Sequence, residues 1–567
     1  MSQFFCRSLA VSALLSLAVM AQAGPLSGTI DLSTVGTTTP GVRFLGIDPA
    51  KSAAGCSVSS AGDFDGDGME DLLIGDKWVG PGGQSHAGET YLVYGKGPTE
   101  MLSGTIDLAT VGETTRGVRF QGTNSRDESG FSVSSAGDVN GDGVDDVLIG
   151  AWYANFQSGA TYLVYGQRGA AALSGTIAVS TVGSTTPGAR FEGRQPGDLS
   201  GRAVSPAGDF NGDGLSDLLI GATGVDYSGP LNAGEVYLVY GQPEPMPLSG
   251  TISVSTVGGT TTGVRFRGMK EYMNAGVCLS SAGDINGDGV DDVVMGAKYN
   301  KLSVSGPGEA FLVYGQHGPA ALSGTIDLAS VGGAVAGARF TGINSQTLWD
   351  ITFSVSSAGD VNGDGLDDLL IGSTGANPGG SSAAGETYLV YGQRGPTAPA
   401  GTIDLLTVGS TTPGARLQGI QGFDRSGGCV SSAGDVDRDG VADLLIGAPT
   451  ASRNGKDYAG ETYLVYGQNG PSALSGIIDL SLVGDLVPGA RFQGTDVADN
   501  SGFALAFADF NADGLDDLLI GAPNPNVHVG QAYVIYGQPV PEPGSLTLVV
   551  AGLVALFVCR WRRHSRT

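Results

Sequence analysis

The chain has 567 residues and carries 56 Asp and Glu against 29 Lys and Arg, a formal net charge of −27. So large an acid excess excludes the basic face that a nucleic-acid-binding protein needs, and we expect no nucleic-acid partner. Glycine accounts for 96 residues without the G-X-Y period of collagen, so the composition predicts many turns.

Residues 1–23 have the organisation of a secretory signal peptide. Arg7 supplies the positive charge near the start, an apolar run follows, and Ala21-Gln22-Ala23 fits the small-x-small rule for cleavage. A buried helix is the alternative, and it is disfavoured because nothing helical follows. We therefore expect an exported protein.

Between the two ends the sequence repeats itself. The segment LSGTIDL at 26–32 recurs at 102–108, and each copy of the repeat ends in a run like the YLVYG of residues 91–95. The expected repeats cover about 26–95, 102–166, 173–241, 248–315, 322–392, 400–467 and 474–537. Because self-similarity of this kind overrides length as a guide to domain number, we expect one domain over residues 24–538.

Each repeat contains short runs that are rich in Val, Ile, Leu, Phe and Tyr and bounded by Gly, Asp, Asn and Ser, a pattern typical of strands. In the second repeat these runs are 105–108, 118–121, 131–135, 146–150 and 161–165. Val147, Leu148 and Ile149 are apolar in succession, so both faces of that strand should be buried. Seven small sheets sandwiched between neighbours predict an all-β, seven-bladed β-propeller with four-stranded blades and little helix. An open array of repeats is the alternative.

The middle of each repeat carries a nine-residue acidic frame, for example DVNGDGVDD from Asp138 to Asp146. Positions 1, 3, 5 and 9 are always Asp or Asn, and position 6 is always Gly. Calcium takes six to eight oxygen ligands in a flexible geometry, and a chain that turns around the ion can offer oxygens at alternate positions. The carbonyl of position 7 can then face inward, and the Asp at position 9 can close the shell.

We therefore expect calcium as the cofactor, with up to seven ions. The frames contain no His or Cys, which disfavours zinc, and magnesium rarely uses such a cage. An isolated acidic turn is the alternative for one frame, but seven frames in register disfavour it. The expected ligands are Asp63, Asp65, Asp67, Met69 and Asp71; Asp138, Asn140, Asp142, Val144 and Asp146; Asp209, Asn211, Asp213, Leu215 and Asp217; Asp284, Asn286, Asp288, Val290 and Asp292; Asp360, Asn362, Asp364, Leu366 and Asp368; Asp435, Asp437, Asp439, Val441 and Asp443; and Asp509, Asn511, Asp513, Leu515 and Asp517.

Two frames depart from the common pattern at position 4, where Arg438 and Ala512 replace Gly. The frames also differ from an EF-hand, which needs Glu at position 12 and a following helix. Position 12 here is Ile or Met inside a strand-like run, such as Ile149. The frames therefore predict a strand–loop–strand site, and the sixth and seventh sites are the least regular.

The far end of the chain, residues 539–567, has three parts in order. Pro541-Glu542-Pro543 comes first, an apolar run at 546–559 follows, and residues 560–567 close the chain with four Arg and Trp561. This arrangement resembles the PEP-CTERM sorting signal of Gram-negative bacteria. The resemblance implies that this segment holds the protein in the membrane until an exosortase-type membrane enzyme processes it near the Pro-Glu-Pro, and that the protein is then released to the cell surface or extracellular matrix. A plain membrane anchor is the alternative.

The repeats resemble the FG-GAP repeat of integrin α-subunit propellers. The resemblance rests on Phe131, the frame that follows it, and LIGA at 148–151, and literal Gly-Ala-Pro occurs at 447–449 and 521–523. It covers about residues 26–538, and bacterial integrin-α-like secreted proteins are more similar still. It implies a seven-bladed propeller with calcium between two adjacent strands of a blade. The chain departs from integrins because all seven repeats carry the frame.

For function we expect a non-catalytic adhesion or binding protein whose partner is an extracellular polysaccharide or a surface protein. A polysaccharide lyase or hydrolase on the same scaffold is the alternative, for which Glu271 or Asp350 could supply an acid. The sequence offers this enzyme little, because it has no G-x-S-x-G or H-E-x-x-H motif, and His86, His317 and His528 lie in different repeats. We therefore expect no catalytic residues.

Specificity should lie where the repeats differ, because the strands and acidic frames are common to all of them. The most variable stretches follow the Ile-Gly run or precede the Ser-Ser-Ala-Gly run of each repeat. They carry aromatic residues that sugar rings could stack against, namely Trp152, Tyr299, Trp349 and Tyr458. The alternative for each is that it packs on its own blade.

Overall fold

The computed structural model describes residues 24–48, 51–226, 231–298, 308–342, 353–524 and 529–539. The expected signal peptide at 1–23 lies outside the described residues, and so does the expected sorting segment beyond residue 539. Within the described ranges, no helix has the length and apolar character needed to cross a membrane.

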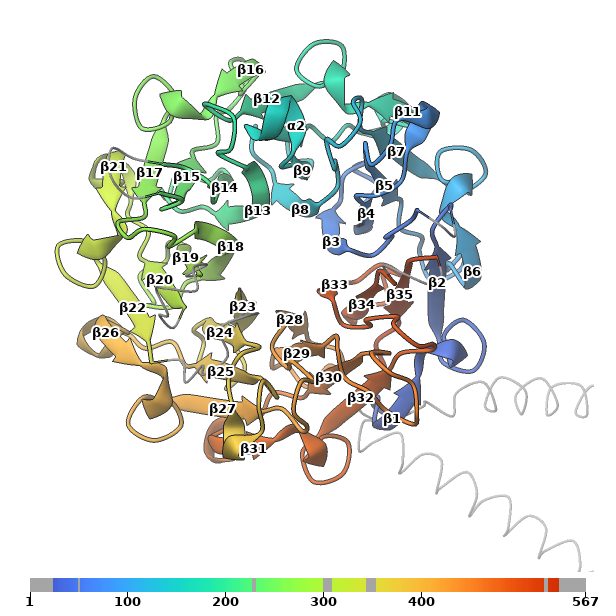
Figure 1. The fold of residues 1–567 in the computed structure, drawn as a ribbon, viewed down its shortest axis with the longest axis vertical. Coiled ribbons are helices and arrows are strands. Elements are labelled where there is room, and N and C mark those ends of the chain that lie inside the picture. The colour runs from blue at the N-terminus through green and yellow to red at the C-terminus, as the bar shows by residue number, and fades with distance from the viewer. Residues whose placement is uncertain are drawn as a thin grey trace, which may run out of the picture.

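The described strands form seven five-stranded sheets, arranged as blades around a central axis (Figure 1). This confirms the predicted all-β, seven-bladed propeller. The prediction of four strands per blade was wrong, because every sheet has a fifth, outermost strand. In blade 1 the order is β3-β4-β5-β7-β11; the first four strands are antiparallel and the fifth is parallel to the fourth.

The innermost strands of blades 1 to 7 line the axis. They are β3 (Ser57–Gly62), β8 (Ser132–Gly137), β13 (Ser200–Gly208), β18 (Ala275–Gly283), β23 (Phe353–Gly359), β28 (Cys429–Gly434) and β33 (Ala504–Ala508). The second strands are β4 (Asp71–Asp76), β9 (Asp146–Ala151), β14 (Asp217–Ala222), β19 (Asp292–Ala297), β24 (Asp368–Ser373), β29 (Asp443–Ala448) and β34 (Asp517–Ala522). The third are β5 (Glu89–Val93), β10 (Ala160–Val164), β15 (Glu235–Val239), β20 (Glu309–Val313), β25 (Glu386–Val390), β30 (Glu461–Val465) and β35 (Gln531–Ile535).

The two outer strands of each blade come from the next two repeats around the ring, so that those of blade 7 come from the first and second repeats. In the order of blades 1 to 7, the fourth strands are β7 (Gly117–Gln121), β12 (Gly188–Glu192), β17 (Gly263–Arg267), β22 (Gly337–Thr341), β27 (Gly414–Gln418), β32 (Gly489–Gln493) and β2 (Gly41–Leu45). The fifth are β11 (Gly175–Ala178), β16 (Gly250–Ser253), β21 (Gly324–Asp327), β26 (Gly401–Asp404), β31 (Gly476–Asp479), β1 (Gly28–Asp31) and β6 (Gly104–Asp107).

The ring is closed by strands from the first repeat. β1 pairs with β32 in blade 6, and β2 pairs with β35 in blade 7, so the start and end of the repeat region lie side by side (Figure 1). Each repeat therefore contributes strands to three successive blades. This exchange ties every blade to its neighbours and leaves no open end, which excludes the open array.

Helix is confined to single turns. Apart from α2 (Ala154–Gln157), the described helices are three-residue 3₁₀ turns. Seven follow the outermost strands, namely η1 (Leu32–Thr34), η3 (Leu108–Thr110), η5 (Val179–Thr181), η6 (Val254–Thr256), η8 (Leu328–Ser330), η11 (Leu405–Thr407) and η13 (Leu480–Leu482). The others are η2 (Pro81–Gly83), η9 (Pro378–Gly380), η4 (Gly169–Ala171), η7 (Gly318–Ala320), η10 (Gly395–Thr397) and η12 (Gly470–Ser472).

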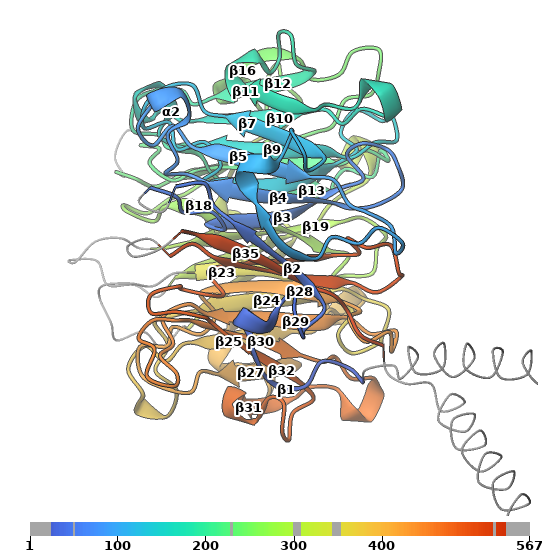
Figure 2. The same ribbon diagram turned by 90° about the vertical axis from the view of Figure 1, so that its right-hand side faces the viewer.

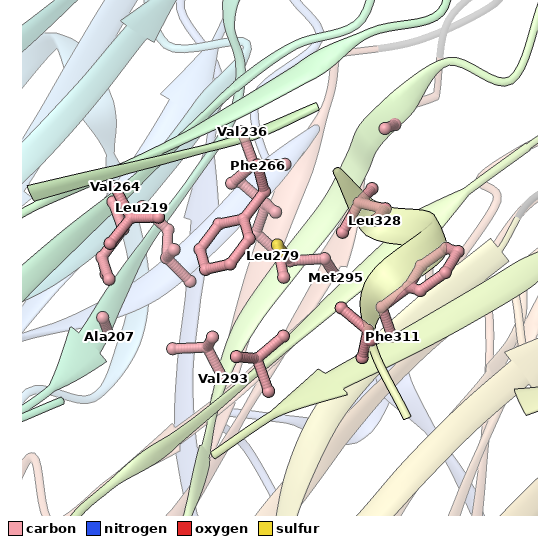
Figure 3. Packing of buried hydrophobic residues seen from close by; sticks show 14 of the residues in the cluster. Ala207, Leu219, Val236, Val264, Phe266, Leu279, Val293, Met295, Phe311 and Leu328 are labelled. Atoms are coloured by element: carbon pink, nitrogen blue, oxygen red, sulfur yellow. The ribbon is translucent and has the colours of Figure 1, made fainter. Parts of the chain in front are cut away.

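The core consists of seven hydrophobic clusters, one between each pair of adjacent blades. Figure 3 shows the cluster in which Leu219 and Val236 of blade 3 face Val293 and Met295 of blade 4. Both faces of the second and third strands must be apolar for this packing, and every residue of β9 is buried, as predicted. Because the core lies between the sheets, the loops at either end of the strands are free for other roles.

The strand order defines two faces of the ring, which Figure 2 shows edge-on. The first strand of each blade runs to the loop face, where the acidic frame connects it to the second strand. The second strand returns to the opposite face, which we name the variable face. That face carries the connections between second and third strands, including α2, and those between fourth and first strands.

Candidate metal sites

The acidic frames form seven loops on the loop face, which we number 1 to 7 after their blades. Each loop follows the end of an innermost strand and ends on the first residue of the second strand, as loop 2 does between β8 and Asp146. In loops 1 to 6 the strand ends in a bulge at a Gly with positive φ, such as Gly137 (φ 64°). The bulge turns the chain away from the ladder and begins the loop.

The carboxylate at position 1 organises each loop from inside. In loop 2, Asp138 Oδ1 accepts hydrogen bonds from the N–H groups of Gly141 (2.7 Å) and Asp142 (3.1 Å), and Oδ2 accepts one from Gly143 (2.7 Å). The bond from position 6 recurs in all seven loops at 2.7–3.0 Å. The chain therefore curls around this side chain.

The carboxylate at position 5 fixes the second half of the loop. Its Oδ1 accepts from the N–H of position 7 in all seven loops, for example from Val144 to Asp142 at 2.9 Å. The side chain at position 7 is apolar; it is buried in loops 2, 4, 5, 6 and 7, where Val144 is 4% exposed, and half-buried in loops 1 and 3. This residue anchors the loop, and the role of its carbonyl as a ligand stays a prediction.

The carboxylate at position 9 is completely buried in every loop. In loop 2, Asp146 Oδ2 accepts from the N–H of Val139 (3.1 Å), and Oδ1 accepts from the N–H of Gly166 after β10 (3.0 Å). Burial and the nearby acids of the same loop raise the pKa of Asp146 to about 8, although both backbone hydrogen bonds oppose the rise. The same causes raise the pKa of its counterparts to about 8 or 9.

The loop carboxylates converge closely enough to share one cation. In loop 1, ligand atoms of Asp63, Asp65 and Asp67 all lie within 4.8 Å of one another, and so do those of Asp435, Asp437 and Asp443 in loop 6. Two of these oxygens, Asp63 Oδ1 and Asp65 Oδ1, are buried without a hydrogen-bond partner among the described residues. Like charges and orphaned oxygens are unfavourable unless a cation joins them, so the donors fit a hard ion such as calcium.

Position 3 is Asn in loops 2, 3, 4, 5 and 7 and Asp in loops 1 and 6, and in loop 2 Asn140 Oδ1 accepts from the N–H of Asp142 at 2.9 Å. In loops 3, 4, 5 and 7 the Asn amide faces the position-9 carboxylate, as Asn362 Nδ2 does at 3.3 Å from both oxygens of Asp368. A half-turn rotation of this amide would exchange Nδ2 for Oδ1, which could then act as a ligand to a bound ion. Loops 1 and 6 have Asp65 and Asp437 there. Each of these two loops also has an additional Arg that is absent from the equivalent position of the other loops: Arg116 beside loop 1 and Arg438 within loop 6.

In loop 1 the additional Arg reaches the loop from the next repeat. Arg116 Nη2 lies 2.8 Å from Asp65 Oδ2, whose side chain is 1% exposed, and Nη1 lies 3.7 Å from Asp67. Pro187 occupies the corresponding place beside loop 2. Arg116 therefore offsets the fourth carboxylate of loop 1, which the sequence analysis did not anticipate because the two residues are 51 positions apart.

The irregular residues at position 4 adopt a conformation that suits Gly. Gly141 has φ 75° in loop 2, and Arg438 and Ala512 have φ 63° and 54° in loops 6 and 7. The left-handed region costs a residue with a side chain about 1 kcal/mol or more. Loops 6 and 7 thus keep the common geometry at the cost of backbone strain.

Position 8 has a role that the sequence analysis missed. The carboxylate of Asp145 in loop 2 accepts from the N–H of Asp63 in loop 1 at 2.9 Å. Equivalent bonds join loops 3 and 4, 4 and 5, and 6 and 7 at 2.8–2.9 Å. Position 8 therefore staples neighbouring loops together. Its variation among Asp, Glu, Ser and Ala hid this role.

The variable-face aromatics predicted for binding differ in environment. Trp152 packs in a cluster that spans two blades: its ring contacts Phe131 (4.7 Å between centroids), Nε1 donates to Glu128 (2.9 Å), and Arg202 of β13 in blade 3 lies over it. It is therefore part of a packed cluster and no open platform. Tyr458 is 53% exposed, as predicted. Tyr299 and Trp349 lie outside the described residues, as do Asp350 and His528, whereas Glu271 and His86 are exposed.

Comparison with known proteins identifies the repeat. The FG-GAP repeat family matches residues 129–165, 200–239, 280–314, 353–390, 430–465 and 501–535, and these segments contain loops 2 to 7. Loop 1 lies outside the matched segments, but it has the same hydrogen bonds at positions 1, 5 and 9. The structure therefore adds a seventh repeat.

Two curated relatives share part of this region. Phosphatidylinositol-glycan-specific phospholipase D of Dictyostelium discoideum is 31% identical over 197 residues, 33% of this chain and 19% of that enzyme. Integrin alpha-5 of Xenopus laevis is 28% identical over 276 residues, 48% of this chain and 21% of the integrin. The chain thus spans about a fifth of the length of each relative.

Among solved structures, the Dos1 propeller aligns with 87% of this chain and 80% of its own length, at 11% identity and a TM-score of 0.34. That likeness is too weak to bear on fold or function. The seven sheets and the matched repeats instead support the assignment of the propeller fold. The chain is a seven-bladed β-propeller in which six segments match the FG-GAP repeat, and part of it is similar to integrin alpha-5.

Proposed function

We propose that this protein is an exported, calcium-stabilised propeller that binds an extracellular polysaccharide without cleaving it. The observation that carries the proposal is the division between the two faces. The loop face repeats one arrangement of oxygen ligands seven times, whereas the variable face carries loops that differ from blade to blade. One face suits a structural ion, and the other suits recognition.

Calcium would be held by the side chains at positions 1, 3, 5 and 9 of each loop. Bound there, it would neutralise the converging carboxylates and join the end of the first strand to the start of the second. The staples at position 8 would pass this rigidity to the next loop, as from Asp145 to Asp63. Up to seven ions would thereby stiffen the whole ring.

The variable face supports binding through exposed aromatic side chains on rigid blades. Phe156, Phe423, Tyr458 and Phe503 are 92%, 61%, 53% and 45% exposed. All four lie in second-to-third or fourth-to-first connections, and so on one face of the ring. Aromatic rings present large apolar areas at small entropic cost, which suits contact with the C–H faces of sugars.

Two further parts of the proposal rest on the terminal sequences. The signal-like residues 1–23 support export, and the PEP-CTERM-like residues 539–567 support sorting to the surface of a Gram-negative bacterium. If the tail is processed, protein recovered from the cell surface lacks the residues from Arg560 to Thr567. An intact C-terminus in that protein would favour a plain membrane anchor.

Retention of the calcium-loaded protein on immobilised bacterial exopolysaccharide tests the binding function. We expect retention to fall several-fold in Tyr458→Ala and Phe423→Ala. Leu486→Ala is the matched control: this residue is 80% exposed but precedes β32 on the loop face, so its loss should leave retention unchanged. Retention by a surface protein alone, with none by polysaccharide, would contradict the proposal.

The relationship to a phospholipase D makes catalysis the alternative to test in the same samples. The matched segment covers only 19% of that enzyme, so its activity does not transfer with the repeats. We expect no release of reducing ends, unsaturated sugars or phospholipid headgroups. Turnover that is lost on changing one carboxylate outside the seven loops would make the protein an enzyme.

A further inference from the structure

The seven loops share one geometry but differ in charge. Loops 1 and 6 carry four carboxylates at positions 1, 3, 5 and 9, because Asp65 and Asp437 stand where the other five loops have Asn. The charge of the ligands sets the calcium affinity of such loops, and a cation beside the carboxylates opposes the ion. The Arg residues around the loops therefore decide how strongly each loop attracts calcium.

In loop 1 the additional carboxylate is already paired. Arg116 Nη2 lies 2.8 Å from Asp65 Oδ2, and Nη1 lies 3.7 Å from Asp67 Oδ2, so the cation contacts two of the expected ligands. The guanidinium carbon of Arg116 lies 5.4 Å from the centre of the Tyr94 ring, which helps to hold the side chain beside the loop. An ion that enters loop 1 must therefore compete with a cation of the protein itself.

In loop 6 the additional carboxylate has no such partner. Asp437 is 5% exposed, and its ligand oxygen lies within 4.8 Å of those of Asp435 and Asp443. Among the residues that the structure describes, no Lys or Arg forms an ion pair with the carboxylates of loop 6. Negative charges thus converge in a buried place without a cation between them, and a bound calcium ion relieves their repulsion.

The Arg within loop 6 acts on the neighbouring loop. Arg438 belongs to loop 6 in sequence, but its guanidinium lies beside Gly514 of loop 7. There it is close enough to attract the carboxylate of Asp513. The side chain therefore lowers the net charge of loop 7 and leaves the carboxylates of loop 6 without compensation.

Loops 2 and 5 have an Arg at the place that Arg438 takes beside loop 7. Arg168 Nη2 donates to the carbonyl of Gly143 in loop 2, and Arg394 Nη2 donates to that of Gly365 in loop 5 at 3.1 Å. These loops have three carboxylates and an adjacent cation. Of the seven loops, all of which lie within the described ranges, loop 6 alone combines four carboxylates with no ion-paired cation.

We propose that loop 6 is the high-affinity calcium site of the ring and that Arg116 holds the affinity of loop 1 below it. This inference rests on the calcium binding proposed above and goes beyond it by ranking the sites. The ranking is the reverse of what the irregular residue at position 4 of loop 6 indicates in the sequence. Because β1 of the first repeat completes blade 6, the first ion stabilises a blade at which the ring closes.

The test removes calcium from the loaded full-length protein with chelators of increasing affinity and counts the ions that remain. We expect one ion to be bound at least tenfold more tightly than the others. Asp437→Asn gives loop 6 the residue of loops 2 to 5, and it should remove this tight ion. Asp65→Asn is the matched control, because it makes the same change in loop 1 and should leave the tight ion in place. Melting temperatures in saturating calcium show that the variants are folded.

Two Arg variants test the compensating charges. Arg116→Pro gives loop 1 the residue that Pro187 supplies beside loop 2, so four carboxylates are left without their cation and a second tight ion should appear. Arg438→Gln should leave the affinity for the tight ion unchanged within about twofold, because this guanidinium lies on loop 7. A tenfold gain in that affinity would show that Arg438 acts on loop 6 instead.

The remaining outcomes separate this inference from the proposed function. If Asp437→Asn keeps the tight ion, or if all ions leave the unchanged protein together, the ranking is overturned but calcium binding stands. A tight ion that is lost in Asp65→Asn would assign the high affinity to loop 1. If the unchanged protein binds no calcium, the proposed role of the ion fails together with the ranking.

Discussion

The loop face and the variable face are built by the ends of the same strands, but they follow different rules. On the loop face, the position-1 carboxylate accepts from the position-6 N–H in all seven blades, from Asp63 to Asp509. On the variable face, the corresponding connections range from the turn of α2 to the Pro-Gly-Gly turn of η2. One face has a common chemical task, whereas the other is free to diverge because the core lies between the sheets.

The comparison predicts that single changes on the loop face cost far more stability than changes on the variable face. Asp146→Ala removes an expected ligand and leaves the buried N–H groups of Val139 and Gly166 without acceptors. We expect it to lower the free energy of unfolding by roughly 2–5 kcal/mol in calcium. Tyr458→Ala should change it by less than about 0.5 kcal/mol. Equal effects of the two changes in urea unfolding would break the comparison.

The loop face should also make the calcium-free protein sensitive to pH. Burial raises the pKa of Asp146 and its counterparts to about 8 or 9, above the unfolded value of about 3.9. The native state therefore holds protons that the unfolded chain has released, and its stability falls as the pH rises from about 4 to about 8. We expect the melting temperature of calcium-depleted protein to be higher at pH 5 than at pH 8. Calcium should abolish this fall, and an identical pH profile with calcium would contradict the assignment.

The staple at position 8 should stabilise the ring independently of the ion. Asp145→Ala leaves the N–H of Asp63 without its acceptor, so we expect a loss of about 1–2 kcal/mol with and without calcium. Blade 6 offers the reverse experiment, because Ala442 occupies position 8 there and could be changed to Asp. That variant should gain stability. A loss for Asp145→Ala seen only in calcium would show that Asp145 is a ligand instead.

The smallest effect concerns the strain in loops 6 and 7. Ala512→Gly relieves the left-handed conformation at φ 54°, and we expect a gain of about 0.5–1 kcal/mol. Gly141→Ala makes the reverse change in loop 2 and should lose stability. Urea unfolding at constant calcium measures both. If Ala512→Gly destabilises the protein, loop 7 does not share the geometry of the other loops.

The repeat made the fold predictable from the sequence. What could not be predicted were the contacts between different repeats. Seven units with apolar runs such as Val147 to Ile149 indicated blades buried on both sides. All five strands of a repeat were predicted, but the place of the fifth in a blade was missed because β11 pairs with β7 of the preceding repeat, a partner that no local pattern reveals. The sequence pattern within one repeat therefore predicts where the strands lie. The exchange of outer strands between blades follows only from closure of the ring.

The metal sites show the same difference between features within one repeat, which were predicted, and contacts between repeats, which were not. Positions 1, 5 and 9 of the loops were evident because Asp recurs there in every repeat. Arg116 and Asp145 were missed because they act on the loop of another repeat and vary between repeats. For Trp152 the sequence left stacking on sugars and packing on its own blade as alternatives, and the contact of Arg202 from the following repeat, 4.7 Å from the centre of its ring, was not foreseen. Contacts across blade boundaries are thus what sequence patterns do not show.

Thermal unfolding with and without calcium, combined with the number of ions bound at saturation, tests the central claim most directly. We expect up to seven ions per chain. With a Kd of about 10⁻⁴ M, ~1 mM calcium adds about 1.4 kcal/mol per site, or roughly 10 kcal/mol for the ring. Chelation should therefore lower the melting temperature greatly. An unchanged melting temperature in excess chelator, with no calcium bound at saturation, would contradict the account.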